Sequence, residues 1–79
     1  MEPEGIKQLI EQGLDGAEAE VSGDGTHFEA IVVSDAFAGK TMVQQHQLVY
    51  QALGDKLKEE IHALALRTFT REQWTKQTG

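Results

Sequence analysis

The chain has 79 residues, no cysteine and a formal net charge of −6, with 39% hydrophobic residues. This length predicts one domain with a modest core, over residues 1–79. The absence of cysteine excludes a disulfide, a thiolate nucleophile and a self-contained Cys-type zinc or iron–sulfur site. The first residues lack a secretory signal, and no apolar run approaches the ~20 residues that span a bilayer. We therefore expect a soluble, cytoplasmic protein.

Acidic residues are concentrated at the start of the chain. Residues 1–24 carry seven acids and one base, whereas the remainder balances six acids with six bases. Nucleic-acid phosphates repel an acidic domain unless its bases gather locally. Solubility is the simpler interpretation of this charge.

The first predicted element is an amphipathic helix. Its apolar residues recur at helical spacing, and Pro3 suits a first turn. Gly13 suits the left-handed residue that follows a helix. The apolar residues are Ile6, Leu9, Ile10 and Leu14.

Two strands around an Asp-Gly turn predict an antiparallel hairpin next. Residues 17–22 alternate between small apolar and polar side chains, and residues 27–34 form a second, more apolar strand. Because Ile31, Val32 and Val33 are consecutive, we expect this strand to be central and covered on much of both faces.

A loop in which Phe37 enters the core leads to a second amphipathic helix. Thr41 and Gln44 fit a capping box at its start, and Gly54 closes it. Residues 55–60 have room for one or two further helical turns. The expected core stripe comprises Leu48, Val49, Ala52 and Leu53.

Residues 61–69 alternate as a third strand, and a short helix over residues 71–76 follows. Thr70 and Gln73 predict its capping box, while Phe69 and Trp74 occupy the positions of a hydrophobic staple. The predicted order is α-β-β-α-α-β-α, an α+β fold with a three-stranded sheet packed by helices.

No catalytic arrangement emerges from the sequence. A nucleophile elbow, paired catalytic acids and a P-loop are all missing, and residues 22–25 lack the spacing of a dinucleotide-binding loop. We therefore expect a protein that is not an enzyme.

Three histidines remain as metal-ligand candidates. His46 lies on an apolar helical stripe, where a satisfied core or boundary residue is the more common outcome. His27 begins the second strand, where bonding to a loop carbonyl is the simpler expectation. His62 begins the third strand, at the end of the sheet, where a neutral imidazole can offer its lone pair to a metal. By spacing alone, a structural bridge from His62 to Glu59 or Glu60 and the backbone is the stronger alternative.

Two long segments, residues 26–53 and 59–74, resemble the BolA family. The shared features are ordered: His-Phe opening the second strand, Val-Val-Ser closing it, Phe-x-Gly, Gln-His before Leu-Val-Tyr, Ile-His-Ala-Leu, and Thr-x-x-x-Trp. This resemblance implies a fold similar to a class II KH domain. It also changes the expectation for His62, which matches the signature histidine of the family.

The resemblance implies that His62 ligates a [2Fe-2S] cluster shared with a monothiol glutaredoxin. In such a complex the glutaredoxin and its bound glutathione each give a thiolate. Many family members carry Cys or His within the hairpin loop as a second candidate ligand. Here residues 23–26 contain neither, so only His27, at the edge of the loop, remains as a weak metal candidate. Asp24 is a hard oxygen donor that suits iron–sulfur chemistry poorly.

The competing hypothesis is direct DNA binding, because some BolA-like proteins are described as transcriptional regulators. A KH domain clamps the nucleic-acid backbone with a GxxG loop, and residues 53–58 have one glycine and an acid there. The remaining basic candidates are Lys56, Lys58, Arg67, Arg71 and Lys76.

The expected interface with the glutaredoxin surrounds the start of the third strand and the final helix. We expect a monomer that forms a heterodimer with this partner, with a homodimer as a further possibility. A protein-interaction module that binds no metal is a third option.

Overall fold

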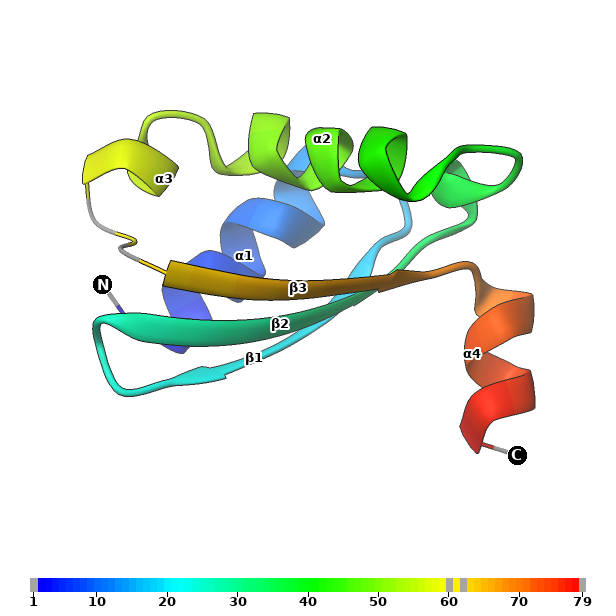
Figure 1. The fold of residues 1–79 in the computed structure, drawn as a ribbon, viewed down its shortest axis with the longest axis horizontal. Helices are drawn as coiled ribbons and strands as arrows, with labels where there is room; N and C mark the ends of the chain where they lie inside the picture. The colour runs from blue at the N-terminus through cyan, green and yellow to red at the C-terminus, as the bar shows by residue number, and fades with distance from the viewer. Residues whose placement is uncertain (1, 60, 62, 79) are drawn as a thin grey trace.

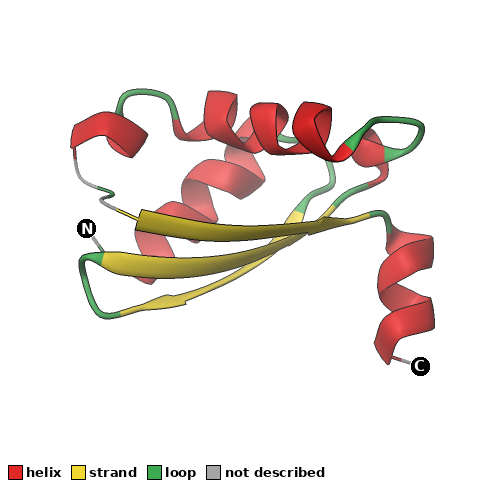
Figure 2. Cartoon of the chain, in the orientation of Figure 1, coloured by secondary structure: helices red, strands yellow, loops and turns green. Residues whose placement is uncertain are grey.

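The computed structural model describes residues 2–59, 61 and 63–78, with the side chain of residue 78 left out. It is an α+β fold with a three-stranded sheet, as predicted, and its helices lie mainly on one face of that sheet (Figures 1 and 2). None of the helices in the described ranges is long and apolar enough to cross a membrane. The elements are α1 (Pro3–Gly13), β1 (Glu18–Gly23), β2 (His27–Val33), the 3₁₀ turn η1 (Asp35–Phe37), α2 (Met42–Leu53), α3 (Lys56–Glu59), β3 (Ala63–Phe69) and α4 (Arg71–Thr78).

The sheet has the order β1-β2-β3, so the most apolar strand is central, as predicted. β1 pairs with β2 antiparallel, and β2 pairs with β3 parallel in a continuous register from His27 opposite Ala63 to Val33 opposite Phe69. Alternate residues therefore face the helices, where they form one core. The fully buried large side chains include Ile6, Ile10, Phe28, Val32, Phe37, Val49 and Leu53.

Local sequence patterns set most helix boundaries. The Thr41–Gln44 capping box is present at the start of α2, and the backbone N–H of Gly54 closes the helix on the carbonyl of Tyr50. At α4 the Thr70 hydroxyl accepts from the Gln73 N–H at 3.2 Å, and the Gln73 side chain accepts from the Thr70 N–H at 2.9 Å. α4 runs two residues further than predicted.

The prediction for Gly13 is wrong. Gly13 is the last residue of α1, and it is not among the positive-φ glycines. A Cβ at this position would lie 2.6 Å from the Cβ of Ala52 on α2. The glycine is therefore required by the close crossing of two helices rather than by the end of one helix.

Candidate functional site

The turn between β1 and β2 is held by one carboxylate. Asp24 Oδ1 accepts hydrogen bonds from His27 N–H at 2.9 Å, from Thr26 N–H at 3.0 Å and from the Thr26 hydroxyl at 3.0 Å. Gly25 has a φ of +103°, which favours glycine. The Asp-Gly pair is thus the reason why the two strands reverse within so few residues.

These hydrogen bonds keep Asp24 ionised. The backbone N–H of His27, then the backbone and hydroxyl of Thr26, lower the pKa of the Asp24 carboxyl from 3.8 to about 2. One of its two oxygens already accepts three hydrogen bonds. Asp24 therefore orders the turn.

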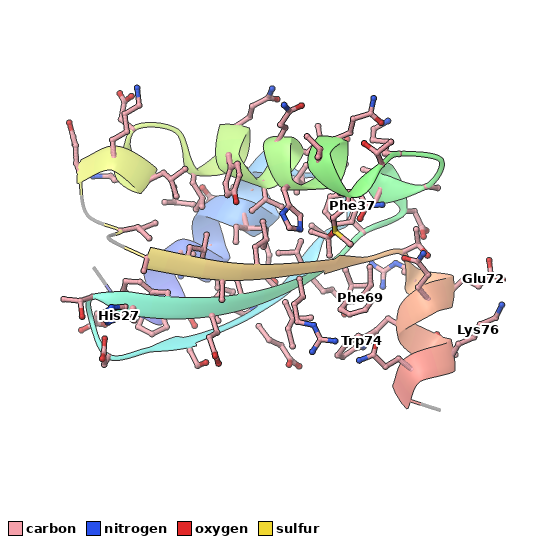
Figure 3. All side chains as sticks on the ribbon, in the orientation of Figure 1. His27, Phe37, Phe69, Glu72, Trp74 and Lys76 are labelled. Atoms are coloured by element: carbon pink, nitrogen blue, oxygen red, sulfur yellow. The ribbon has the colours of Figure 1, made fainter. Side chains whose placement is uncertain are left out.

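The His27 side chain projects into solvent from the hairpin end of the sheet (Figure 3). Its ring is 77% exposed, with Nδ1 3.2 Å from the Thr26 hydroxyl and 4.0 Å from Asp24 Oδ2. The expected bond to a loop carbonyl is therefore wrong, because a hydroxyl on the preceding residue occupies Nδ1. No described residue hydrogen-bonds to Nε2, and the side chain is largely exposed, so this nitrogen is available to a metal.

His62 lies outside the described residues, so its solvent access stays a prediction. Its two neighbours in the sequence are both described. Ile61 is buried and donates its N–H to the carbonyl of Lys56. Ala63 opens β3 opposite His27 and donates its N–H to the carbonyl of Thr26. The chain is thus anchored on either side of His62, and Ala63 fixes the start of β3 beside the hairpin turn.

His46 is half-buried on α2, as expected for a boundary residue. Its ring meets Tyr50 edge-on, with centroids 6.3 Å apart and planes at 72°. Its Nε2 is buried without a hydrogen-bond partner among the described residues. The expectation of a fully satisfied histidine is therefore wrong for this nitrogen.

The described residues contain no group of three or more His, Cys, Asp or Glu side chains that could hold a metal ion. His27 can offer a single imidazole nitrogen. Any iron–sulfur cluster bound through these residues would need its other ligands from elsewhere, since such a cluster takes four ligands. The described residues by themselves therefore do not form a cluster site.

The five basic candidates do not gather into one patch. Lys56 and Lys58 lie on α3, whereas Arg71 and Lys76 lie on α4, and Figure 1 shows these helices at opposite ends of the sheet. Arg67 lies on the strand between them, with its guanidinium 5.4 Å from the centre of the Phe69 ring.

Both α4 cations have acidic neighbours. Arg71 lies 3.2 Å from Glu18 and 3.9 Å from Asp35, and it donates to the Gly16 carbonyl at 2.7 Å. Lys76 lies 3.2 Å from Glu72 (Figure 3). These contacts indicate that the α4 cations stabilise the fold or neutralise local charge.

The expected interface is also divided. The start of β3 and helix α4 flank opposite ends of the seven-residue strand, which separates them by roughly 20 Å at ~3.3 Å per residue. A partner that contacts both places would therefore have to extend along the length of β3. The interface itself stays a prediction.

One surface feature was missed at the sequence level. A shallow hollow of about 320 Å³ lies on the sheet, lined by residues that include Glu20, Glu29, Ile31, Ala65 and Arg67. The alternation of residues along β1, β2 and β3 could have predicted this hollow. Its lining side chains alternate with the core side chains, so they lie on the face of the sheet that points away from the core.

Comparison with known proteins gives a consistent result. Residues 10–73 match the family model described as BolA-like protein. A DNA-binding transcriptional regulator BolA from Vibrio cholerae is 40% identical over 73 residues, which cover 92% of this chain and 66% of the relative. The chain spans about half to two thirds of the length of the first curated relatives it matches.

Solved structures agree with this assignment. A bolA protein homologue from Coxiella burnetii has a TM-score of 0.88 and 42% identity, covering 95% of this chain and 97% of its own. The BolA domain of SufE1 from Arabidopsis thaliana has a TM-score of 0.72 and 35% identity, covering 89% and 92%. The same fold therefore occurs both as a separate protein and as a domain of a larger one.

Proposed function

Since this chain belongs to the BolA-like family, we propose that it is a non-enzymatic adaptor in iron–sulfur cluster or iron homeostasis. It binds a monothiol glutaredoxin carrying a [2Fe-2S] cluster and supplies His62 as one ligand. The glutaredoxin and its glutathione provide the thiolates that this chain lacks.

The observation that carries the proposal is the arrangement of the hairpin end. His27 and Ala63 are opposite each other in the β2–β3 ladder, and His62 directly precedes Ala63 in the sequence. His27 therefore lies at the same end of the sheet as the start of β3. It is the second candidate ligand, and the Thr26 hydroxyl lies 3.2 Å from its Nδ1.

Imidazole ligation would give the shared cluster a higher reduction potential and a proton-sensitive release. The chain's own contribution would be an imidazole at the hairpin end of the sheet. The ordered turn at Asp24 and the buried Ile61 reduce the freedom of the segments on both sides. Such pre-organisation lowers the entropy lost on binding.

The proposal is tested by titrating the protein into a cluster-loaded monothiol glutaredoxin while visible absorption and circular dichroism are recorded. We expect the spectrum to change with wild type and not with His62→Ala. His46→Gln, which removes a histidine from a different element, should behave like wild type. An unchanged spectrum, or equal spectra for wild type and His62→Ala, would defeat the ligand assignment. Binding that is indifferent to His62 and to iron would instead identify an interaction module without metal.

DNA binding is the second candidate, favoured by the name of the Vibrio cholerae relative. It predicts binding near physiological salt that weakens with each of Arg67→Ala and Arg71→Ala. The division of the cations between the two ends of the sheet argues against a single phosphate-binding surface. A mobility-shift assay at moderate salt with no shift would remove this candidate.

A further inference from the structure

β3 is an edge strand with one unpaired side. The N–H of Ala63 donates to Thr26 on the β2 side, and the carbonyl of Phe69 accepts from Ser34 on the same side. Because backbone groups of alternate residues in a parallel strand point to opposite sides, the odd-numbered residues face β2. Leu64, Leu66 and Thr68 consequently present their backbone groups to the free edge, where no described strand pairs with them.

The usual protections of an edge strand are missing from β3. It runs for seven residues in regular register with β2, and it contains no proline and a single charged residue, Arg67. Natural sheets normally blunt such an edge with bulges, prolines, several charges or a covering element. An edge that stays open favours the addition of another strand.

Helix α2 places an apolar surface beside this edge. We call it the α2 ledge: Met42, Val43, His46 and Tyr50. At 3.6 residues per turn these residues fall within an arc of roughly 100° on one side of the helix. Met42, Val43 and Tyr50 are the exposed large hydrophobic residues of the described chain, at 60%, 66% and 38%. Met42 Sδ lies 3.7 Å from the Thr68 hydroxyl, which places the ledge next to β3.

We propose that the free edge of β3 binds an extended segment of a partner protein as a fourth strand. The side chains of that strand on the helix face would pack under the α2 ledge, so its alternate residues are apolar. The side chains of the added strand on the sheet face away from the helices would meet Arg67. Arg67 forms no ion pair with any described residue. An acidic residue at that position completes the match.

A second copy of this chain fits the edge poorly. Among the strands, α2 packs mainly over β3, as Figure 1 shows, and strands in a sheet are ~4.8 Å apart. Pairing β3 with the β3 of a second copy would bring two α2 helices closer than the ~8–10 Å that packed helices need. An extended partner segment that carries no helix above it would pair with β3 without this clash between helices. Nucleic acid is also disfavoured, because the ledge carries no Lys or Arg and the net charge is −6.

The probe is a seven-residue peptide with valine at its odd positions, glutamate at position 4 and threonine at positions 2 and 6. Amide exchange is followed by NMR on the full chain. We expect saturating peptide to slow exchange at Leu64, Leu66 and Thr68 about tenfold or more, whereas Ala19 on β1 is unchanged. Replacing the glutamate of the peptide with lysine should weaken binding, since it opposes Arg67.

Two matched variants separate the ledge from general effects on α2. Tyr50→Lys puts a cation on the ledge and should weaken the peptide about tenfold, or ~1.4 kcal/mol. Gln51→Lys adds the same charge one residue away on the outer face and should bind like wild type. Equal weakening by both variants, or no protection of the three amides, would overturn the proposal. Protection by a single-stranded oligonucleotide, or by raising the protein concentration alone, would overturn it in favour of those occupants.

His62 is not among the residues that define the edge and the α2 ledge. The peptide should bind the His62→Ala variant as it binds wild type, so failure of the edge proposal and failure of the cluster-ligand proposal can be told apart.

Discussion

The two edge strands of the sheet, β1 and β3, differ in whether their outward backbone groups have hydrogen-bond partners. On β1, Asp24 and His27 close the hairpin with an Asp24 N–H to His27 carbonyl bond, so Ala19 points its N–H away from β2. The Glu11 carboxylate of α1 accepts this N–H at 3.1 Å. Glu18 and Glu20 add charge along the same strand. No described residue makes a comparable contact with the outward backbone groups of β3, so the two edges of this sheet differ in their cover.

The closed edge depends on the composition of α1. Lys7 lies 2.8 Å from Glu11 and holds its carboxylate toward β1, and this contact, together with the Ala19 N–H, lowers the pKa of Glu11. The side of α2 next to β3 has methionine, valine and tyrosine instead. The two edges therefore differ because of the helices beside them. α1 presents a hydrogen-bond acceptor to β1, whereas α2 presents an apolar surface beside β3.

The largest expected effect on stability comes from a substitution in the core that supports both edge strands. Phe28 is buried at 1% on the central strand, and Phe28→Ala should lower the free energy of unfolding by about 3–5 kcal/mol. Because such a loss can unfold a small domain, Phe28→Leu provides a milder version at about 1 kcal/mol. Denaturant unfolding with amide exchange should show both edges loosened alike by Phe28→Leu. Loosening confined to one edge would contradict a common core.

A smaller effect is expected at the anchor of β3. The Thr68 hydroxyl donates to Gln45 Oε1 at 2.6 Å in the buried interior. Thr68→Val leaves that oxygen unpaired and should cost about 1–3 kcal/mol. Thr75→Val, on the exposed side of α4, is the control. Equal midpoints in urea for Thr68→Val and wild type would show that this hydrogen bond adds no stability.

At the closed edge, Glu11→Ala removes the acceptor of the Ala19 N–H. We expect about 1 kcal/mol or less of lost stability and faster amide exchange at Ala19, with little change at Leu66. Glu4→Ala removes an acid from the same helix without touching β1. If Glu4→Ala speeds exchange at Ala19 equally, the carboxylate of Glu11 does not protect this edge.

The smallest effect concerns the turn that joins β1 to β2. The folded pKa of Asp24 is about 2 against 3.8, so its stabilisation is present above pH ~4 and is lost as the pH falls toward 2. Asp24→Ala should lower the melting temperature slightly at neutral pH, and the difference from wild type should shrink below pH 4. A difference that grows on acidification would show that Asp24 does not act through its charged form.

Short-range patterns predicted the elements well. The capping boxes at Thr41 and Thr70 and the staple of Phe69 on Trp74, with ring centroids 5.3 Å apart, each depend on residues within five positions. The buried Phe37 and the central apolar strand also followed from local composition. Such features are fixed by the chain itself, so the sequence is sufficient to predict them.

Features that depend on distant residues were not predictable in this way. Gly13 is needed because Ala52 approaches it, and the local pattern near Gly13 contains no trace of that helix crossing. The separation of α4 from the start of β3 likewise follows from the extended path of the strand (Figure 2). The metal assignment of His62 stands on the family resemblance, whereas the exposed ring of His27 is a property of the structure.

We propose above that an imidazole of this chain binds iron held by another protein. The most direct test is pulsed EPR on the reduced complex with cluster-loaded glutaredoxin, using ¹⁵N-histidine incorporated into this chain alone. We predict a ¹⁵N coupling to the cluster in wild type, its disappearance in His62→Ala and its persistence in His46→Gln. No coupling in wild type, or an unchanged coupling in His62→Ala, would show that His62 does not bind the cluster.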